Sequence, residues 1–206
     1  MFSTGFRFSC MLGSASLLVA IVAGCATAPS PTGFLSDYSR LEPGGSQRLA
    51  FADSSLGQYS KFIIEPVVVR FHDPAEEKKV DHETIVQLRE YMEDAISKAI
   101  SDRYAIVSQP GPGVARLRVA LTDLDKSTPA LNVLPQTKLT GLGVGGAAME
   151  AELLDSQTGV QIAAVVQKKK GSMLSFSGLK KWGDAKAVMD AWAKRFRERL
   201  DEAHGG

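Results

Sequence analysis

Two segments of the chain carry the spacing of apolar residues that is typical of amphipathic helices. Between residues 81 and 100, and again between residues 184 and 203, apolar side chains recur every three or four positions with charged side chains between them. Asp81 and Asp184 stand at the starts of these segments, where a carboxylate can accept hydrogen bonds from the first backbone amides of a helix. Because neither segment is apolar all round, we expect each helix to lie on the surface of a sheet.

Other segments have the apolar pattern of β-strands. They comprise residues 61–71, 104–107, 114–122, 147–154 and 160–168. Pro66 lies inside the first of them, and a proline in a strand indicates an edge or a bulge. The last two flank a turn that ends in Gly159, as expected for a hairpin. The order of elements predicts a two-layer α+β fold, in which a mostly antiparallel sheet of four to five strands carries two amphipathic helices on one face.

The start of the chain has the composition of a secretory signal peptide. It contains Arg7 and no acidic residue, followed by an apolar run over residues 11–22 that is shorter than the ~20 residues needed to cross a bilayer. A buried helix of the mature domain is the alternative interpretation. The position at the extreme start of the chain favours the signal peptide.

The end of this segment, Val22, Ala23, Gly24 and Cys25, resembles the lipobox of bacterial lipoproteins. The resemblance implies that a signal peptidase recognises the residues before Cys25, that the Cys25 sulfur receives a diacylglyceryl group, and that the new amino group is acylated, for example with palmitate. The next residue is Ala26 and not Asp, which in lipoproteins of this kind implies the outer membrane. Two or more acyl chains anchor a protein stably. We therefore expect a domain that faces the periplasm and is held to the membrane by its acyl chains.

The chain is expected to have three parts. Residues 1–24 form the signal peptide, residues 25–60 a lipidated tether and surface-docking segment, and residues 61–204 a periplasmic α+β domain. The tether is rich in Ser, Pro and Gly, as linkers are. It nevertheless contains three large apolar residues, Phe34, Leu35 and Tyr38. These residues either pack onto the surface of the domain or form a docking peptide for a partner.

Composition narrows the chemistry that the chain can perform. Of its 206 residues 44% are hydrophobic and 23% charged, with a net charge of +1, which argues against both a multi-span membrane protein and a polyelectrolyte. Both cysteines lie within the first 25 residues, so the domain contains no disulfide, zinc thiolate or cysteine nucleophile. No cofactor and no resident metal are expected, and the domain is expected not to be an enzyme. A metal-dependent hydrolase that uses His72, Asp73, His82 and Glu83 is the alternative, although the ligand spacing of a zinc hydrolase is absent.

Positive charge gathers toward the C-terminus. Residues 168–206 contain ten basic and five acidic residues. Such a basic segment either contacts anionic lipid headgroups or a partner protein, or is a solvated face. Nucleic acid is not an expected partner of an envelope protein. The predicted partner surface joins the apolar residues of the tether to four residues of the last helix, Lys194, Arg195, Arg197 and Arg199, and the loop over residues 127–145 is a further candidate.

Several segments together resemble an uncharacterised family of bacterial lipoproteins, the domain of unknown function 3313. The likeness is carried by residues 33–41, 64–67, 118–123, 145–159 and 182–200. It implies the extent of the domain and its lipoprotein character, and it brings no catalytic residues. The predicted function is a non-enzymatic outer-membrane lipoprotein that binds or assembles with another envelope protein. A carrier of a lipid or small ligand is the remaining alternative, and it requires an apolar cavity between helices and sheet. The oligomeric state stays open.

Overall fold

The computed structural model describes residues 30–45, 47–128, 144–171 and 180–206. The predicted signal peptide and the lipobox, including Val22, Ala23, Gly24 and Cys25, lie outside these residues, as does most of the loop over residues 127–145. Within the described parts of the chain, no helix is long and apolar enough to cross a membrane.

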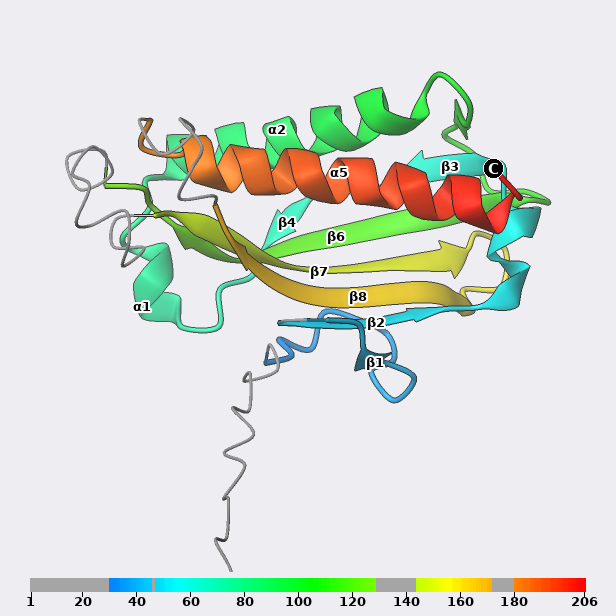
Figure 1. The fold of residues 1–206 in the computed structure, drawn as a ribbon, viewed down its shortest axis with the longest axis horizontal. Coiled ribbons are helices and arrows are strands. Elements are labelled where there is room, and N and C mark those ends of the chain that lie inside the picture. The colour runs from blue at the N-terminus through cyan, green and yellow to red at the C-terminus, as the bar shows by residue number, and fades with distance from the viewer. Residues whose placement is uncertain (1–29, 46, 129–143, 172–179) are drawn as a thin grey trace, which may run out of the picture.

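A single sheet with the two long helices on one side forms the body of the protein (Figure 1). Its strands are β1 (Glu42–Pro43), β2 (Arg48–Ala52), β3 (Lys61–Ile64), β4 (Val68–Val69), β5 (Ala105–Ile106), β6 (Val114–Asp125), β7 (Gly146–Asp155) and β8 (Gln161–Lys170). The strand order is β1-β2-β8-β7-β6-β3-β5, with β4 also paired to β6. The helices are α1 (Pro74–Glu77), α2 (His82–Ile100) and α5 (Gly183–Ala203), and a 3-10 turn, η1, spans Ser54–Gln58.

The predicted fold class is wrong in the size and character of the sheet. The described sheet has eight strands and is mixed, because β3 runs parallel to β5 and β6, and β4 runs parallel to β6. The described residues also contain three helices, not two. A helical crossover between β4 and β5 returns the chain in the same direction, and this connection produces the parallel pairs. The strands β1 and β2 arise from the segment predicted as a tether, so the sheet begins before residue 61.

Pro66 divides the first predicted strand into β3 and β4. A proline cannot donate to a ladder, so the backbone beside it needs other partners. The amide of Val67 donates to Glu93 of α2 over 2.7 Å, and the carbonyl of Val67 accepts from Arg89 of the same helix. The break in the strand therefore fastens α2 to the sheet.

The two long helices begin differently. Asp81 caps α2 as predicted, because its carboxylate accepts a hydrogen bond from the Thr84 amide over 2.8 Å. The predicted cap of α5 is wrong: Trp182 is the N-cap, and Asp184 lies inside the first turn. The buried carboxylate of Asp184 instead accepts hydrogen bonds from the Ser127 hydroxyl (2.8 Å) and the Gly145 amide (3.0 Å). It joins α5 to the ends of β6 and β7.

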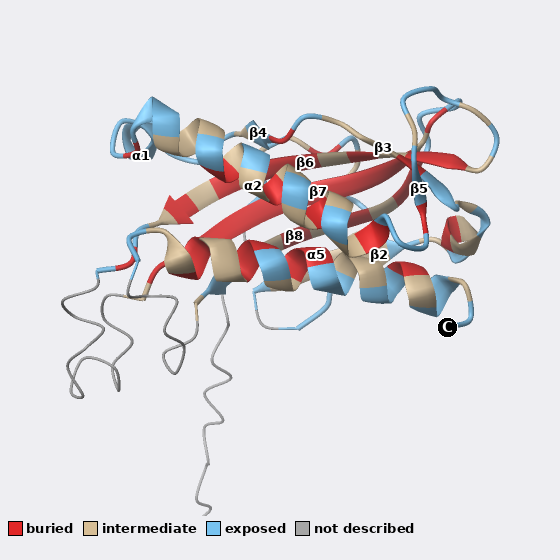
Figure 2. Ribbon diagram, turned by 90° about the horizontal axis from the view of Figure 1, so that it is seen from above, coloured by how far each residue is buried: buried red, intermediate tan, exposed pale blue. Residues whose placement is uncertain are grey.

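The main core lies between the sheet and the helices α2 and α5 (Figure 2). Its fully buried side chains include Phe62, Leu88, Ile96, Ile100, Leu121, Met189 and Leu200. The ring of Phe62 packs edge-on against Tyr104 at 5.7 Å and against Phe196 at 5.9 Å, which brings α5 onto β3. A second, smaller cluster lies on the other face of the sheet and contains Leu35 from the N-terminal segment.

Candidate functional site

An apolar pocket with a volume of about 330 Å³ opens between the sheet and α5. Its floor consists of rows of side chains that cross β6, β7, β8 and β2, since residues paired across neighbouring strands share a face. One row comprises Val119, Ala151, Val165 and Ala50, and the next comprises Leu117, Leu153, Ala163 and Ala52. Four of these eight residues are alanines, whose short side chains leave space above the floor.

The helices close only part of this floor. Trp192 and Phe196 of α5 line the pocket from above, together with Met92 and Ile96 of α2. Ala163 and Val165 remain half-buried although β8 is an inner strand of the sheet. An apolar surface that the protein's own helices leave uncovered is available to an apolar ligand.

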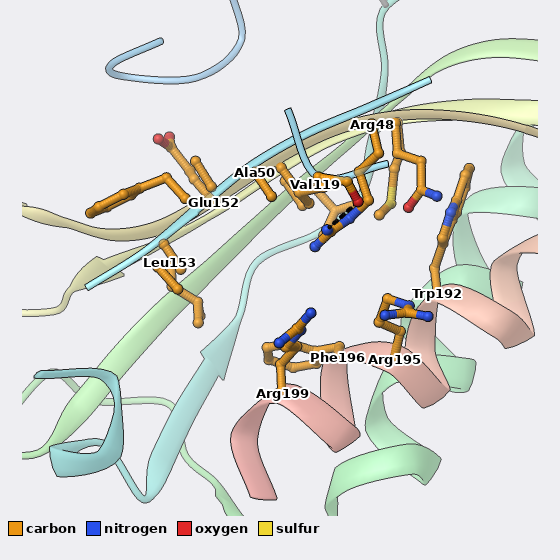
Figure 3. A pocket seen from close by; sticks show the side chains of 18 of the residues that line it. Arg48, Ala50, Val119, Glu152, Leu153, Trp192, Arg195, Phe196 and Arg199 are labelled. Carbon is orange, nitrogen blue, oxygen red and sulfur yellow. Dashed lines mark hydrogen bonds between the residues drawn. The ribbon is translucent and has the colours of Figure 1, made fainter. Parts of the chain in front are cut away.

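Three arginines surround the opening of the pocket: Arg48 comes from β2, and Arg195 and Arg199 come from α5. Their guanidinium groups approach the opening from opposite sides (Figure 3). Burial lowers the pKa of the Arg48 guanidinium, and the charges of Arg199 and Arg195 lower it further. The opening is therefore a place where cationic groups meet at the edge of an apolar surface.

Few protein groups neutralise these arginines. Arg48 donates to the Gly44 carbonyl over 3.3 Å, while its Nε is buried without a hydrogen-bond partner among the described residues. Arg199 lies 2.7 Å from Glu202 in an exposed ion pair. Arg195 makes no hydrogen bond or ion pair with the described part of the chain. Arg48 is half-buried while Arg195 and Arg199 are exposed, so the opening presents positive charge that the described residues neutralise only in part.

The reverse face of the pocket floor carries two buried carboxylates. Glu150 and Glu152 alternate with the pocket residues of β7, and they are only 0% and 1% exposed. A segment over residues 30–41, which we call the N-terminal strap, covers them. Glu150 accepts hydrogen bonds from the Thr32 amide and from the Tyr38 hydroxyl. The hydrogen bond to Glu150 and burial raise the pKa of Tyr38, burial having the larger effect.

Glu152 binds the strap through Ser36. Its carboxylate accepts from the Ser36 amide (2.9 Å) and hydroxyl (2.7 Å), and it also pairs with Arg118 of β6. Leu35, 6% exposed, packs in the small cluster beside these groups. The strap is therefore fixed to the sheet directly behind the pocket. The sequence analysis missed the two glutamates, although two acids at alternate positions in an otherwise apolar strand indicate a face with polar partners.

The structure divides the residues of the predicted partner surface into several groups. Leu35 is buried, and the ring of Phe34 lies against the Arg118 guanidinium at 4.7 Å, so these side chains contact the domain itself. Arg197 pairs with Asp201 over 2.8 Å and also with Asp102, which ties it to the C-terminal end of α2. Lys194 is exposed and lies 3.9 Å from Glu198. Arg195 and Arg199 alone join the pocket, where they meet Arg48, a residue that the sequence did not single out.

His72 and Asp73, two residues of the metal alternative, have other partners. His72 lies 3.4 Å from Asp123 and close to the Ser30 carbonyl. Asp73 caps α1 through the Ala75 amide at 2.8 Å, and His82 is the first residue of α2. Among the residues that the structure describes, no group of three or more His, Cys, Asp or Glu side chains could hold a metal ion.

Comparison with known proteins identifies relatives of this chain. The "Uncharacterized lipoprotein YdcL" of Escherichia coli (strain K12) is 27% identical over 176 residues, which cover 75% of this chain and 79% of YdcL. Among solved structures, the PelC dodecamer from Paraburkholderia phytofirmans matches 76% of this chain and 96% of its own, with 9% identity and a TM-score of 0.41. Lipoprotein GNA1162 from Neisseria meningitidis matches 69% of this chain and 99% of its own, with 14% identity and a TM-score of 0.29.

A family model extends over most of the chain and confirms the family that the sequence motifs indicated. It matches residues 30–196, from the first residue of the strap to the aromatic residue above the pocket, Phe196. The chain therefore belongs to the family described as "Protein of unknown function (DUF3313)".

Proposed function

We propose that this protein is a membrane-anchored envelope lipoprotein whose domain binds the hydrocarbon chain of a lipid in the pocket beside α5. The apolar floor that the helices leave uncovered carries this proposal. It supports the carrier alternative, which required a cavity between helices and sheet. Fully covering such a surface with a ligand releases about 25 cal/mol for each Å² removed from water.

The anchor belongs to the same proposal. Acyl chains on Cys25 would hold the protein in the outer membrane, and the strap begins five residues later, at Ser30. A chain of that length spans at most about 18 Å when fully extended. The domain would then remain within reach of the membrane surface, where a lipid ligand is found.

Photolabelling of the full chain tests the pocket. The protein, purified with its anchor and placed in phosphatidylcholine nanodiscs, is exposed to two single-chain lipids that carry a diazirine near the end of the chain. One is a neutral monoacylglycerol and the other is lysophosphatidic acid. We expect crosslinks from at least one of them on β7, β8 and the second half of α5, mapped by mass spectrometry of peptides.

A variant that fills the pocket is the matched control. Ala50→Phe places a ring above the row that joins Val119 to Ala50, and we expect it to reduce crosslinking about tenfold. Val160→Phe adds the same ring at a position that is 60% exposed, and it should leave crosslinking unchanged. Absence of pocket crosslinks from both lipids, or equal labelling of Ala50→Phe in its folded state, would contradict the proposal.

A further inference from the structure

We infer that the ligand of the pocket is a single-chain lipid with a phosphate monoester headgroup, which Arg48, Arg195 and Arg199 bind while the chain lies on the apolar floor. This inference rests on the proposed function and adds the chemistry of the headgroup. Nothing in the family description or in the names of the relatives assigns such a ligand.

The opening of the pocket is positively charged. Three arginines line the pocket where the apolar floor ends (Figure 3), and positive charges gathered at one opening repel one another and attract an anion. Burial, and after it the charges of Arg199 and Arg195, lower the pKa of the Arg48 guanidinium, in keeping with the shared position of the three side chains at the pocket. A bound anion would remove this repulsion.

The acidic residues nearby do not supply that anion. Glu152 touches the pocket, but its carboxylate is bound to Ser36 and Arg118 on the other face of the sheet. Glu42 lies at the outer rim, is exposed, and forms no ion pair within the described residues. The pair between Arg199 and Glu202 is exposed, and exposed pairs contribute little. The opening therefore keeps an excess of positive charge.

The arrangement of donors favours a phosphate over a carboxylate. Each guanidinium presents a planar fork of N–H donors that matches two oxygens of one anion. A phosphate monoester has three terminal oxygens and carries a charge of about −1.5 to −2 at neutral pH, so it can accept from several forks at once. The Nε of Arg48, which is buried, has no hydrogen-bond partner among the described residues.

The size of the pocket favours a single hydrocarbon chain. Its volume of about 330 Å³ lies at the lower end of the ~300–1,000 Å³ that is typical of ligand pockets. The rows of the floor are continuous from Val119 on β6 to Ala50 on β2, and Arg48 stands next to Ala50 on the same face. A chain lying along β2 and β8, over Ala52 and Ala50, would thus place its headgroup beside Arg48.

Competition for the photolabel measures the headgroup preference. The full chain in phosphatidylcholine nanodiscs is labelled with the diazirine form of lysophosphatidic acid, and three unlabelled lipids with the same chain compete: lysophosphatidic acid, the fatty acid and the monoacylglycerol. We expect lysophosphatidic acid to compete at concentrations at least about tenfold lower than either of the others. Equal competition by the fatty acid would overturn the assignment of a phosphate.

Arginine variants test whether these side chains bind the phosphate headgroup. Arg48→Met and Arg195→Met remove a charge and keep an apolar stem. Each should raise the concentration of lysophosphatidic acid needed for competition about tenfold and leave that of the monoacylglycerol unchanged. Lys194→Met, on the exposed side of the same helix, is the control and should change neither.

The outcomes separate the two proposals. Pocket labelling that is equal for the charged and neutral lipids, and insensitive to Arg48→Met and Arg195→Met, would refute the phosphate headgroup and leave the lipid pocket standing. Absence of pocket labelling with every lipid would refute both.

Discussion

Truncation of Leu35 tests whether the N-terminal strap is part of the folded domain. Leu35→Ala removes three carbon atoms from a side chain that is 6% exposed and packs against Ala164 and Val166. At ~0.8 kcal/mol for each buried methylene, the lost transfer free energy is about 2.4 kcal/mol. A cavity left by the missing carbon atoms would add to this loss of stability. The added cost is small where neighbouring residues can collapse into the space. We expect the free energy of unfolding to fall by about 2.5 kcal/mol.

Urea unfolding followed by the fluorescence of the two tryptophans, Trp182 and Trp192, measures this change. With a slope of ~2 kcal/mol per M, the midpoint should fall by about 1.2 M. Val160→Ala is the control, since Val160 is 60% exposed and its truncation should change the stability by no more than ~0.5 kcal/mol. If Leu35→Ala behaves like Val160→Ala, the strap is only a tether and its contacts with the sheet do not stabilise the domain.

Two further predictions concern particular contacts, and a third concerns the proposed anchor. Gly57→Ala should destabilise the protein by ~1–3 kcal/mol in the same urea assay, because the new Cβ would lie 2.3 Å from the Ala203 carbonyl oxygen; an unchanged midpoint would contradict the packing of η1 on α5. Burial, followed by hydrogen bonds to aspartates, raises the pKa of Tyr91 and of Tyr104 to about 12, so an ultraviolet titration should show both ionising well above the usual value. Since these folded pKa values are raised, the stability they contribute is complete below pH ~10 and is lost as the pH rises toward ~12; unfolding midpoints that stay constant over this range would refute it. Cys25→Ala should yield a chain that is soluble or uncleaved, and cell fractionation that finds it still membrane-bound with a processed N-terminus would refute the anchor.

The sequence correctly predicted those elements whose start or turn depends on residues close together in the chain. Asp81 and the apolar repeat after it gave α2 its correct start, because an N-cap acts on amides only three residues away. The hairpin of β7 and β8 was equally visible, since its turn and its strands are adjacent in the chain. By contrast, β2 is five residues long and follows a Gly-rich stretch, and only its pairing with β8, more than 100 residues later, makes it a strand.

The pocket could not be predicted from the sequence for a related reason. Arg48 and Arg195 are separated by most of the domain in sequence, and they meet only because β2 pairs with β8, a strand that α5 contacts. Asp184 shows the same effect, because its tertiary partners Ser127 and Gly145 outweigh the local role of a helix cap. Such groupings depend on the order of strands in the sheet, and the spacing of apolar residues along the chain does not determine that order.

The strap follows the proposed anchor in the chain and lies against the reverse face of the pocket floor in the structure of the domain. Glu150 and Glu152 bind the strap on one face of β7, while Met149, Ala151 and Leu153 line the pocket on the other. The strap begins five residues after Cys25. The strand that forms the centre of the pocket floor is therefore also the strand that holds the segment following the proposed anchor.

The most direct test of a pocket for an acidic lipid is a crystal structure of the full chain with lysophosphatidic acid. The account predicts electron density for a single hydrocarbon chain over Ala50, Ala151 and Val165, with the phosphate in contact with Arg48 and Arg195. A structure obtained at saturating lipid in which this pocket is empty, or in which the chain occupies it with the phosphate directed away from the arginines, would contradict the account.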